Sequence, residues 1–258
     1  RIGPGPVGGA LRDQIASQVE RLRRDFKIDL RVRGVAGSRV MRLVQGSVDL
    51  ARWREEYAAG EGPVDLERFA DHVHADQFPH AVIIDCSANA DVANRYAHWL
   101  SEGIHIVTPN KKANSASYQY YERMRESRRA AGSHYLYEAT VGAGLPVIQT
   151  LRDLRETGDE IRRIEGMFSG TLAYLFNTWD GSQSFSSVVR QAKALGYTEP
   201  DPRDDLSGMD VARKLIILGR EMGQRLEMGD VVVESLVPSA LQKCGIDEFL
   251  DRLSEFDE

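Results

Sequence analysis

The 258-residue sequence is poor in cysteine and contains only Cys86 and Cys244, far apart in the chain. Two isolated cysteines predict neither a disulfide framework nor a cluster of metal ligands. Cys86 lies in an apolar run, which is typical of a small buried side chain.

The sequence also lacks a long apolar segment and an excess of positive charge. No stretch reaches the roughly 18 apolar residues of a membrane span, and no signal peptide is visible. The formal net charge of −6 argues against nucleic-acid binding as the main activity. We therefore expect a cytoplasmic enzyme with a small-molecule substrate and no membrane or nucleic-acid partner.

An initial methionine is missing as well. The chain starts at Arg1-Ile2, directly before a glycine-rich turn, which predicts a piece of a longer protein. Its length suits two domains, and its 42% of apolar residues allows a sizeable core.

Helices alternate with strands in the first half of the chain. Apolar residues share one helical face from Leu11 to Arg24, and Ile28 to Val35 alternates as a strand does. The other expected elements are strands over residues 81–85 and 104–107 and helices over residues 91–100 and 118–131. This alternation predicts a Rossmann-type, mostly parallel sheet with helices on both faces. We assign residues 1–133 to a dinucleotide-binding domain whose first strand is truncated.

The pattern changes after residue 133. We expect strands over residues 135–141 and 161–168 and helices over residues 145–154, 171–179, 185–195 and 208–222. Residues 134–258 therefore form, in this interpretation, a mixed α/β domain that binds the substrate. The predicted fold class of the whole chain is α/β.

A glycine-rich turn opens the first domain, where residues 3–8 read GPGPVG and fit the pattern G-x-G-x-x-G. The first glycine allows a tight turn, the second lets the backbone approach a pyrophosphate, and the third lets the helix pack closely. Because an amphipathic helix and a strand follow, we predict that Gly3, Gly5, Val7 and Gly8 bind a dinucleotide. A plain glycine-rich turn is the alternative.

The end of the second expected strand bears on the choice of cofactor, and residues 35–39 there read VAGSR. An acidic residue at this place would bind the ribose 2′-hydroxyl of NAD. Serine and arginine instead suit a 2′-phosphate, because a guanidinium pairs with phosphate through two hydrogen bonds. We predict a preference for NADP(H) through Ser38 and Arg39. The alternative is that Arg39 is a solvated surface cation.

Two further loops follow strand ends, where ligands bind in parallel sheets. Ser87 and Asn89 are candidates for contacts to the nicotinamide or its ribose, with a helix cap as the alternative role of Asn89. Lys111, within residues 108–112, would lie over the cofactor crevice, and an ordinary exposed lysine is the alternative.

The segment from Gly196 to Lys214 concentrates carboxylates, and a helix is expected to start near its residue 208. Asp210 and Lys214 are four residues apart and share one helical face. An acidic helix start with an ordinary ion pair is one interpretation. In the other, carboxylates bind the ammonium group of a small amino acid, and a lysine supplies or removes a proton during hydride transfer.

Taken together, these stretches resemble the homoserine dehydrogenase family across nearly the whole chain. The resemblance is greatest to the dehydrogenase half of bifunctional aspartokinase–homoserine dehydrogenases. The stretches that carry it are residues 3–8 (GPGPVG), 107–112 (VTPNKK), 137–146 (YEATVGAGLP), 168–171 (FSGT) and 196–214. The family implies NADP- or NAD-dependent interconversion of L-homoserine and L-aspartate 4-semialdehyde, in threonine, methionine and isoleucine biosynthesis.

The resemblance also implies roles for individual residues. Lys214 resembles the catalytic lysine that handles the hydroxyl or carbonyl proton, and Lys111 resembles a second active-site lysine that also lies at the cofactor. The implied substrate-binding residues are Glu199 near the ammonium group, Asp205, Asp210 and Gly170. A similar segment binds a monovalent cation such as Na⁺ in the family, and the implied ligands here are Glu138, Val141 and Ala143.

Family members assemble through their second domain, so we expect that domain to serve oligomerisation, as a homodimer or larger homo-oligomer. They continue past the position of Glu258, so we expect a truncated C-terminus, and the aspartokinase half is absent from this sequence. Two alternatives remain: another NADP-dependent dehydrogenase of a small amino acid, and a cofactor-binding fragment without catalysis. The carboxylates of residues 199–214 and the retention of both Lys111 and Lys214 argue against them.

Overall fold

The computed structural model describes residues 2–75, 78–199 and 201–257. The chain divides into two compact units, Arg1–Leu145 and Pro146–Glu258, and each is described by itself. The expected division of roles after residue 133, with cofactor before it and substrate after it, stays a prediction.

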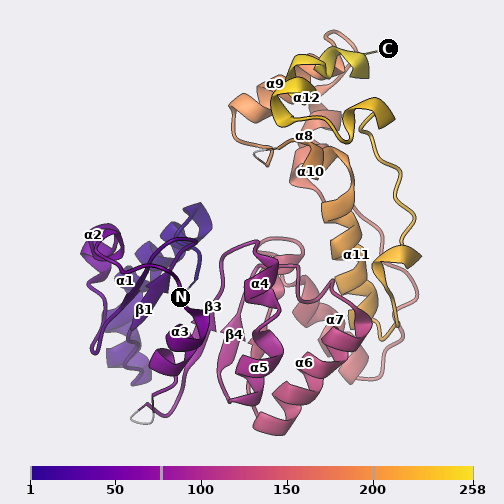
Figure 1. Cartoon of the computed structure of the whole chain (residues 1–258). Helices are drawn as coiled ribbons and strands as arrows, with labels where there is room; N and C mark the ends of the chain where they lie inside the picture. Colours follow the sequence, from indigo (N-terminus) through magenta and orange to yellow (C-terminus); the bar gives the residue numbers. More distant parts are fainter. Residues whose placement is uncertain (1, 76–77, 200, 258) are drawn as a thin grey trace. The chain divides into compact units, whose positions relative to one another are not determined.

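The first unit is built on short strands. They are β1 (Gly34–Ala36), β2 (Met41–Leu43), β3 (Val82–Ile84), β4 (His105–Val107) and β5 (Tyr135–Leu136). β3, β4 and β5 form a parallel sheet in that order, and β1 pairs with β2 in antiparallel fashion. Figure 1 shows β3 beside β4 within this unit.

Ile2 joins the two small sheets into one. It forms parallel bridges with Ala36 on one side and with Asp85 on the other. Its N–H donates to the Ile84 carbonyl and its own carbonyl accepts from the Cys86 N–H, each at 2.9 Å. Ile2 therefore stands where the first strand of a Rossmann-type sheet lies, and the expected α/β class is confirmed.

Helices follow the strands along this unit. They are α1 (Pro6–Phe26), η1 (Leu50–Arg52), α2 (Trp53–Ala58), α3 (Leu66–Val73), α4 (Ala90–Ala93), α5 (Tyr96–Ser101), α6 (Tyr118–Ala131) and η2 (Glu138–Thr140). α1 starts where it does because Gly5 is extended at the N-cap and proline suits the first helical position. Ile83, Trp99, Leu100 and Ile106 are all 0% exposed and form the centre of the core between sheet and helices.

Some expected elements of this unit are confirmed and others are wrong. The helix over residues 118–131 has its predicted bounds. The strand expected from Ile28 begins only at Gly34, because Ile28 and Asp29 are exposed and Arg31 pairs locally with Asp29 at 2.6 Å. The strand over residues 135–141 ends at Leu136, and the 3₁₀ helix η2 begins at Glu138.

Among the described residues of the second unit, every regular element is a helix, in place of the expected mixture of strands and helices. Its helices are α7 (Val147–Glu156), α8 (Gly170–Thr178), α9 (Phe185–Ala194), α10 (Arg203–Leu206), α11 (Met209–Glu221), η3 (Met228–Asp230), η4 (Ser239–Leu241), α12 (Ile246–Asp251) and η5 (Leu253–Phe256). Ser169 and Ser184 cap α8 and α9 by accepting hydrogen bonds from backbone N–H groups. Leu175, Val189 and Phe249, each 0% exposed, lie at the centre of its apolar core.

The strand expected over residues 161–168 is wrong. None of the described residues pairs with this segment, and Met167 within it is 62% exposed. A strand is stable only when a neighbour takes up its backbone hydrogen bonds. The alternating pattern of these residues was therefore not enough to make them a strand, because they have no such neighbour among the described residues.

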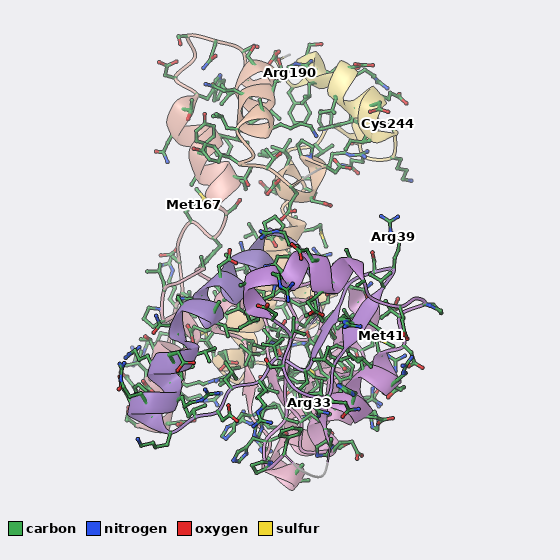
Figure 2. All side chains as sticks on the ribbon, turned by 90° about the vertical axis from the view of Figure 1, so that its left-hand side faces the viewer. Arg33, Arg39, Met41, Met167, Arg190 and Cys244 are labelled. Atoms are coloured by element: carbon green, nitrogen blue, oxygen red, sulfur yellow. The ribbon has the colours of Figure 1, made fainter. Side chains whose placement is uncertain are left out.

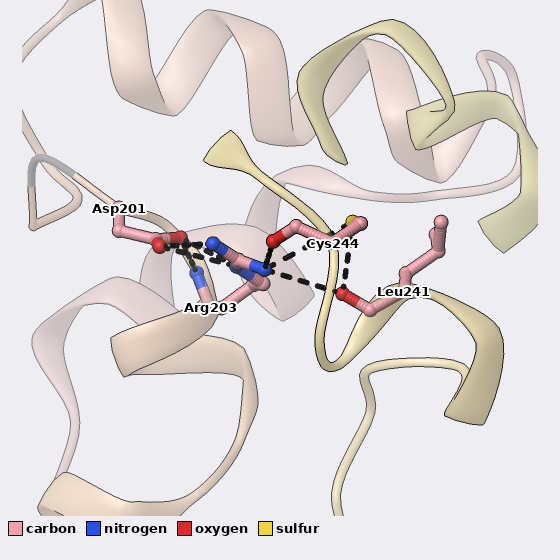
Figure 3. Close-up of polar contacts among 4 residues, drawn as sticks. All are labelled: Asp201, Arg203, Leu241 and Cys244. Atoms are coloured by element: carbon pink, nitrogen blue, oxygen red, sulfur yellow. Dashed lines mark hydrogen bonds and ion pairs between the residues drawn. The ribbon is translucent and has the colours of Figure 1, made fainter. Parts of the chain in front are cut away.

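Arg203 connects the acidic loop before α11 to the segment around Leu241 and Cys244. Its guanidinium pairs with Asp201 at 2.6 Å and donates to the carbonyls of Cys244 at 2.6 Å and Leu241 at 3.3 Å. Figure 3 shows the contacts of Arg203 with both segments. Arg203 also lies 5.2 Å from the centre of the Phe249 ring.

The far end of α11 is held by α7. Glu221, only 4% exposed, accepts from the Arg152 guanidinium at 3.1 Å, and its carbonyl accepts from Arg155 at 2.7 Å. α11 is thus fixed at its end while its first turns carry the residues discussed below. No helix in the described part of the chain is long and apolar enough to cross a membrane.

Candidate active site

The glycine turn follows Ile2 and lies against the loop after β3. Gly3 has a φ of +86°, and a Cβ there would lie 2.8 Å from the carbonyl carbon of Cys86 and 2.9 Å from the Ser87 nitrogen. Other residues strain that conformation and collide with that backbone, so glycine is required on two counts. The first glycine of the motif therefore has the role expected from the sequence.

The same turn opens α1. Gly5 is the N-cap and its carbonyl accepts from the Gly9 N–H at 2.7 Å, while Gly8 is buried and Val7 is 60% exposed. No acidic side chain lies in the first turn of α1. A helix N-terminus without local carboxylates is suited to an anion such as a pyrophosphate, so the residues present fit a dinucleotide.

Ser38 and Arg39 lie in the turn between β1 and β2. Both are exposed, and Figure 2 shows the Arg39 side chain extending away from the ribbon. No acidic residue occurs from Val35 to Val40. Residues 35–40 therefore present a cation and a hydroxyl to a 2′-phosphate, and none of these six residues is acidic.

A buried polar network lies at the ends of β3 and β4. Asp85 is 0% exposed, and its carboxylate accepts from the Tyr96 hydroxyl at 2.5 Å, the Asn110 amide at 3.0 Å and the Ser87 N–H at 2.8 Å. Burial raises the pKa of Tyr96 well above its usual value, and the Asp85 charge adds to that shift. Asp85 thus connects the loop after β3 with the loop after β4.

The predicted cofactor residues of these loops have local partners. Asn89 caps α4 by accepting from the N–H groups of Asp91 at 2.6 Å and Val92 at 3.1 Å, which confirms the helix-cap alternative. The Ser87 hydroxyl accepts from the Asn89 N–H at 3.2 Å. Contacts of either side chain to a cofactor stay predictions.

Lys111 lies in the turn after β4 and is half-buried. The preceding Asn110 is held by the carboxylate of Asp85 and, through its amide, by the Asn89 carbonyl at 3.0 Å. The Lys111 carbonyl accepts from the Ser115 N–H at 3.0 Å and hydroxyl at 2.9 Å. The backbone carrying Lys111 is therefore fixed on both sides.

In the second unit, Lys214 lies one turn into α11. Its ammonium is 2.6 Å from an Asp210 carboxylate oxygen and donates to the Phe168 carbonyl at 2.5 Å. The Lys214 side chain is only 14% exposed. An ammonium has three donors, so among the described residues one donor is left over for a substrate oxygen.

Asp205 fixes the loop in front of α11. It is 9% exposed, and its two carboxylate oxygens accept from the Glu199 N–H and the Thr171 hydroxyl, each at 2.8 Å. Burial raises the pKa of Asp205, and the nearby Asp210 and Asp204 add to the shift, while these hydrogen bonds oppose it.

The second unit therefore brings together most of the predicted substrate residues. Lys214 contacts Asp210, and Asp205 contacts Thr171 and the Glu199 backbone. Asp210 is near enough to Asp205 to contribute to the raised pKa of Asp205. Gly170 is the first residue of α8, next to Thr171. Sequence analysis missed two members, the Thr171 hydroxyl and the Phe168 carbonyl. Both occur in the FSGT stretch, where only Gly170 was assigned a role.

The predicted cation ligands lie at the end of the first unit. Glu138 begins η2, Val141 is buried, and Ala143 has a φ of +52° directly after Gly142 at +79°. Among the described residues, no group of three or more histidine, cysteine, aspartate or glutamate side chains could hold a metal ion. The cation site stays a prediction.

The turn, the parallel sheet and the helix N-terminus define an α/β protein with a Rossmann-type dinucleotide-binding unit. Residues 3–138 match the family model described as "Homoserine dehydrogenase, NAD binding domain", and residues 146–257 match the model "Homoserine dehydrogenase". The chain therefore belongs to the homoserine dehydrogenase family.

Known proteins agree with this assignment. The chain is 53% identical, over its full length, to a chloroplastic bifunctional aspartokinase/homoserine dehydrogenase 1 of Zea mays, of which it spans 28%. It is 41% identical over 99% of its length to the homoserine dehydrogenase of Schizosaccharomyces pombe, of which it spans 70%. A hyperthermophilic archaeal homoserine dehydrogenase in complex with NADPH superimposes with a TM-score of 0.73 at 25% identity, covering 86% of this chain and 69% of that one.

Proposed function

We propose that the protein to which this chain belongs catalyses the NAD(P)-dependent interconversion of L-homoserine and L-aspartate 4-semialdehyde. The observation that carries the proposal is the pairing of Lys214 with Asp210 and of Asp205 with the Glu199 backbone in the second unit, together with a dinucleotide-binding turn in the first. An amino-acid substrate with a hydroxyl or an aldehyde needs a carboxylate that pairs with its ammonium group and a side chain that carries a proton. These residues supply both.

Lys214 is the proposed proton carrier. Its ammonium is held by the Phe168 carbonyl and Asp210, so its position is set before substrate arrives. The Lys214 ammonium donates a proton to the carbonyl oxygen in reduction, and the neutral amine accepts one from the hydroxyl in oxidation. The nicotinamide, when bound, supplies or accepts the hydride.

The carboxylates have distinct proposed tasks. Asp205 accepts from Glu199 and Thr171, so it shapes the loop and the start of α8, while the Glu199 side chain is exposed and is the proposed partner of the substrate ammonium. Asp210 orients Lys214 and lies within reach of the same substrate. Gly170 leaves space at the N-terminus of α8, where a Cβ would meet nothing within 4 Å.

In the first unit, the proposed cofactor contacts are Gly3, Gly5, Val7 and Gly8 for the pyrophosphate, and Ser87, Asn89 and Lys111 near the nicotinamide. Ser38 and Arg39 favour a 2′-phosphate, hence NADP(H) over NAD(H). The archaeal relative named above was solved with NADPH, which supports the same choice.

Three further expectations from the sequence remain proposals. They are a monovalent cation at Glu138, Val141 and Ala143, assembly as a homodimer or larger homo-oligomer, and a cytoplasmic location. The plant relative is named as chloroplastic, so location in particular needs a direct observation.

The experiment is the change in absorbance when the chain is mixed with L-homoserine and NADP⁺, and separately with NAD⁺. Cofactor reduction with L-homoserine but not with L-serine or a sugar alcohol supports the proposal, and faster reduction of NADP⁺ supports the role of Arg39. Equal rates with unrelated substrates would favour another NADP-dependent dehydrogenase. Because the chain spans 28% of the plant relative, an inactive chain is retested within its longer protein, and inactivity there would refute the proposal.

A further inference from the structure

Arg12 is an unusual residue for the interior of a helix that follows a glycine turn. It is 0% exposed, although arginine is among the residue types that are almost never fully buried without a partner. A buried guanidinium must be hydrogen-bonded and its charge compensated to be tolerated. Where its donors go therefore indicates what it does.

The Arg12 guanidinium is directed at the backbone of the glycine turn. Nε donates to the Gly8 carbonyl at 3.2 Å, and one terminal nitrogen donates to the Pro4 carbonyl at 3.4 Å. The carbon of the guanidinium lies 2.9 Å from the centre of the Trp53 ring, which stacks on it. Trp53 is itself 5% exposed and packs with Val35 and Val48. Arg12 is thus clamped between the core and the turn.

The contact with Pro4 has a geometric consequence for the motif. In a trans peptide, the carbonyl and the following N–H point in opposite directions. Because the Pro4 carbonyl turns inward to Arg12, the N–H of Gly5 points outward from the turn. Gly5 is exposed and is the residue whose backbone must approach a pyrophosphate.

Charge adds to this effect. The guanidinium stays protonated at every relevant pH, and burial reduces the solvent screening of its field. The first turn of α1 itself contains no acidic side chain. The turn therefore has a fixed cation behind it in addition to the helix dipole.

We infer that Arg12 is a positioning residue for the pyrophosphate of the dinucleotide, acting through the Pro4 and Gly8 carbonyls and through its buried charge. The inference rests on the proposed cofactor binding and makes no claim about the reaction. Arg12 touches the turn and not the cofactor, so the expected effect is on affinity for ligands that contain a pyrophosphate.

The test compares two ligands on four proteins. Dissociation constants for NADPH are measured by its fluorescence, and those for adenosine 2′-monophosphate, which has no pyrophosphate, by displacement of NADPH. The proteins are the parent chain, Arg12→Met, Arg12→Lys and the control Arg21→Met, whose side chain lies on the same helix but is 56% exposed. Circular dichroism and the unfolding midpoint report whether each variant is folded.

We expect Arg12→Met to weaken NADPH binding about tenfold or more, with adenosine 2′-monophosphate changed by less than about twofold, since only the turn that binds the pyrophosphate is disturbed. Arg12→Lys keeps the charge but loses the forked donor, so its NADPH affinity is expected to lie between those of the parent and Arg12→Met. Arg21→Met is expected to bind NADPH as the parent does.

Unchanged NADPH affinity in a folded Arg12→Met protein would overturn the inference. Equal weakening of both ligands would overturn it too, because Arg12 would then only support the fold. If Arg12→Met does not fold, Arg12→Lys decides by the same two criteria. A parent chain that binds no NADPH would refute cofactor binding itself, an outcome distinct from the others.

Discussion

Single residues in the second unit show how an ordinary ion pair becomes a candidate catalytic group. The pair formed by Asp210 and Lys214 has helical i,i+4 spacing, which in isolation is worth only a few tenths of a kcal/mol. What distinguishes it is the Phe168 carbonyl, 46 residues earlier in the chain, at 2.5 Å from the same ammonium. Two acceptors from separate segments hold Lys214 in one position.

Lys214→Met is expected to reduce turnover of L-homoserine by about 10²-fold or more, because general acid–base groups contribute roughly 10²- to 10⁴-fold. NADPH affinity, measured by fluorescence, is expected to stay unchanged, since the cofactor residues lie in the first unit. Lys243→Met, at an exposed lysine of the same unit, is the control. Turnover that survives Lys214→Met would contradict the assigned role.

Asp205 leads to a prediction on pH. Burial raises its folded pKa above the usual 3.8, so the folded chain binds a proton more readily than the unfolded chain. The free energy of unfolding therefore falls as pH rises from about 3.8 through the raised pKa. The free energy of unfolding of Asp205→Asn is expected to lack this fall. Altered hydrogen bonds are expected to shift it by a constant amount at every pH.

The measurement is urea unfolding of the parent and of Asp205→Asn between about pH 4 and pH 7, with Asp204→Asn as the exposed control. As pH rises, the unfolding free energy of Asp205→Asn is expected to increase relative to that of the parent. Parallel profiles would show that Asp205 titrates as it does in the unfolded chain.

Among the structural elements, the glycine turn depends on the positive φ of Gly3 and on its close approach to the Cys86 backbone. Gly3→Ala places a Cβ 2.8 Å from the Cys86 carbonyl carbon at a φ of +86°, which costs about 1–3 kcal/mol of strain. We expect a less stable first unit and weaker NADPH binding, measured by thermal unfolding and fluorescence. Gly46→Ala, where a Cβ meets nothing within 4 Å, is the control and is expected to change neither.

The acidic loop and the C-terminal helices depend on Arg203. Its hydrogen bonds lower the pKa of Asp201 below 3.8, so this pair stabilises the folded chain above that pH and less so as pH falls. Arg203→Met also removes the donor to the Cys244 carbonyl and is expected to destabilise the second unit by roughly 1–3 kcal/mol near neutral pH.

Urea unfolding at pH 7 and at pH 3 checks this prediction, with Arg162→Met, at an exposed arginine of the second unit, as the control. The loss caused by Arg203→Met is expected to be smaller at the lower pH, because protonation of Asp201 already weakens the pair in the parent. An equal loss at both pH values would assign the effect to the backbone contacts alone.

The chain divides into two compact units. A ligand that binds only the folded first unit stabilises that unit by about 2.7 kcal/mol at a hundred times its dissociation constant. Hydrogen exchange with and without NADPH, read by mass spectrometry, is expected to show slower exchange in residues 2–145 and little change in residues 146–257. Equal protection of both ranges would show that their stabilities are coupled.

Local patterns in the sequence determined the elements whose cause is local. The amphipathic repeat of residues 118–131 became α6 with its predicted bounds, and the G-x-G-x-x-G pattern became a turn in which Gly3 has a positive φ. The i,i+4 spacing of Asp210 and Lys214 likewise predicted their contact. Periodicity, turn chemistry and helix geometry act over a few residues, so one sequence was enough to predict them.

Only the tertiary structure decided features that depend on partners distant in sequence. Residues 161–168 alternate like a strand, yet no described residue pairs with them. The contacts of Thr171 with Asp205 and of Phe168 with Lys214 leave no spacing signal in the sequence. A hydrogen bond between distant segments is set by how the chain packs, and no pattern of neighbouring residues records it.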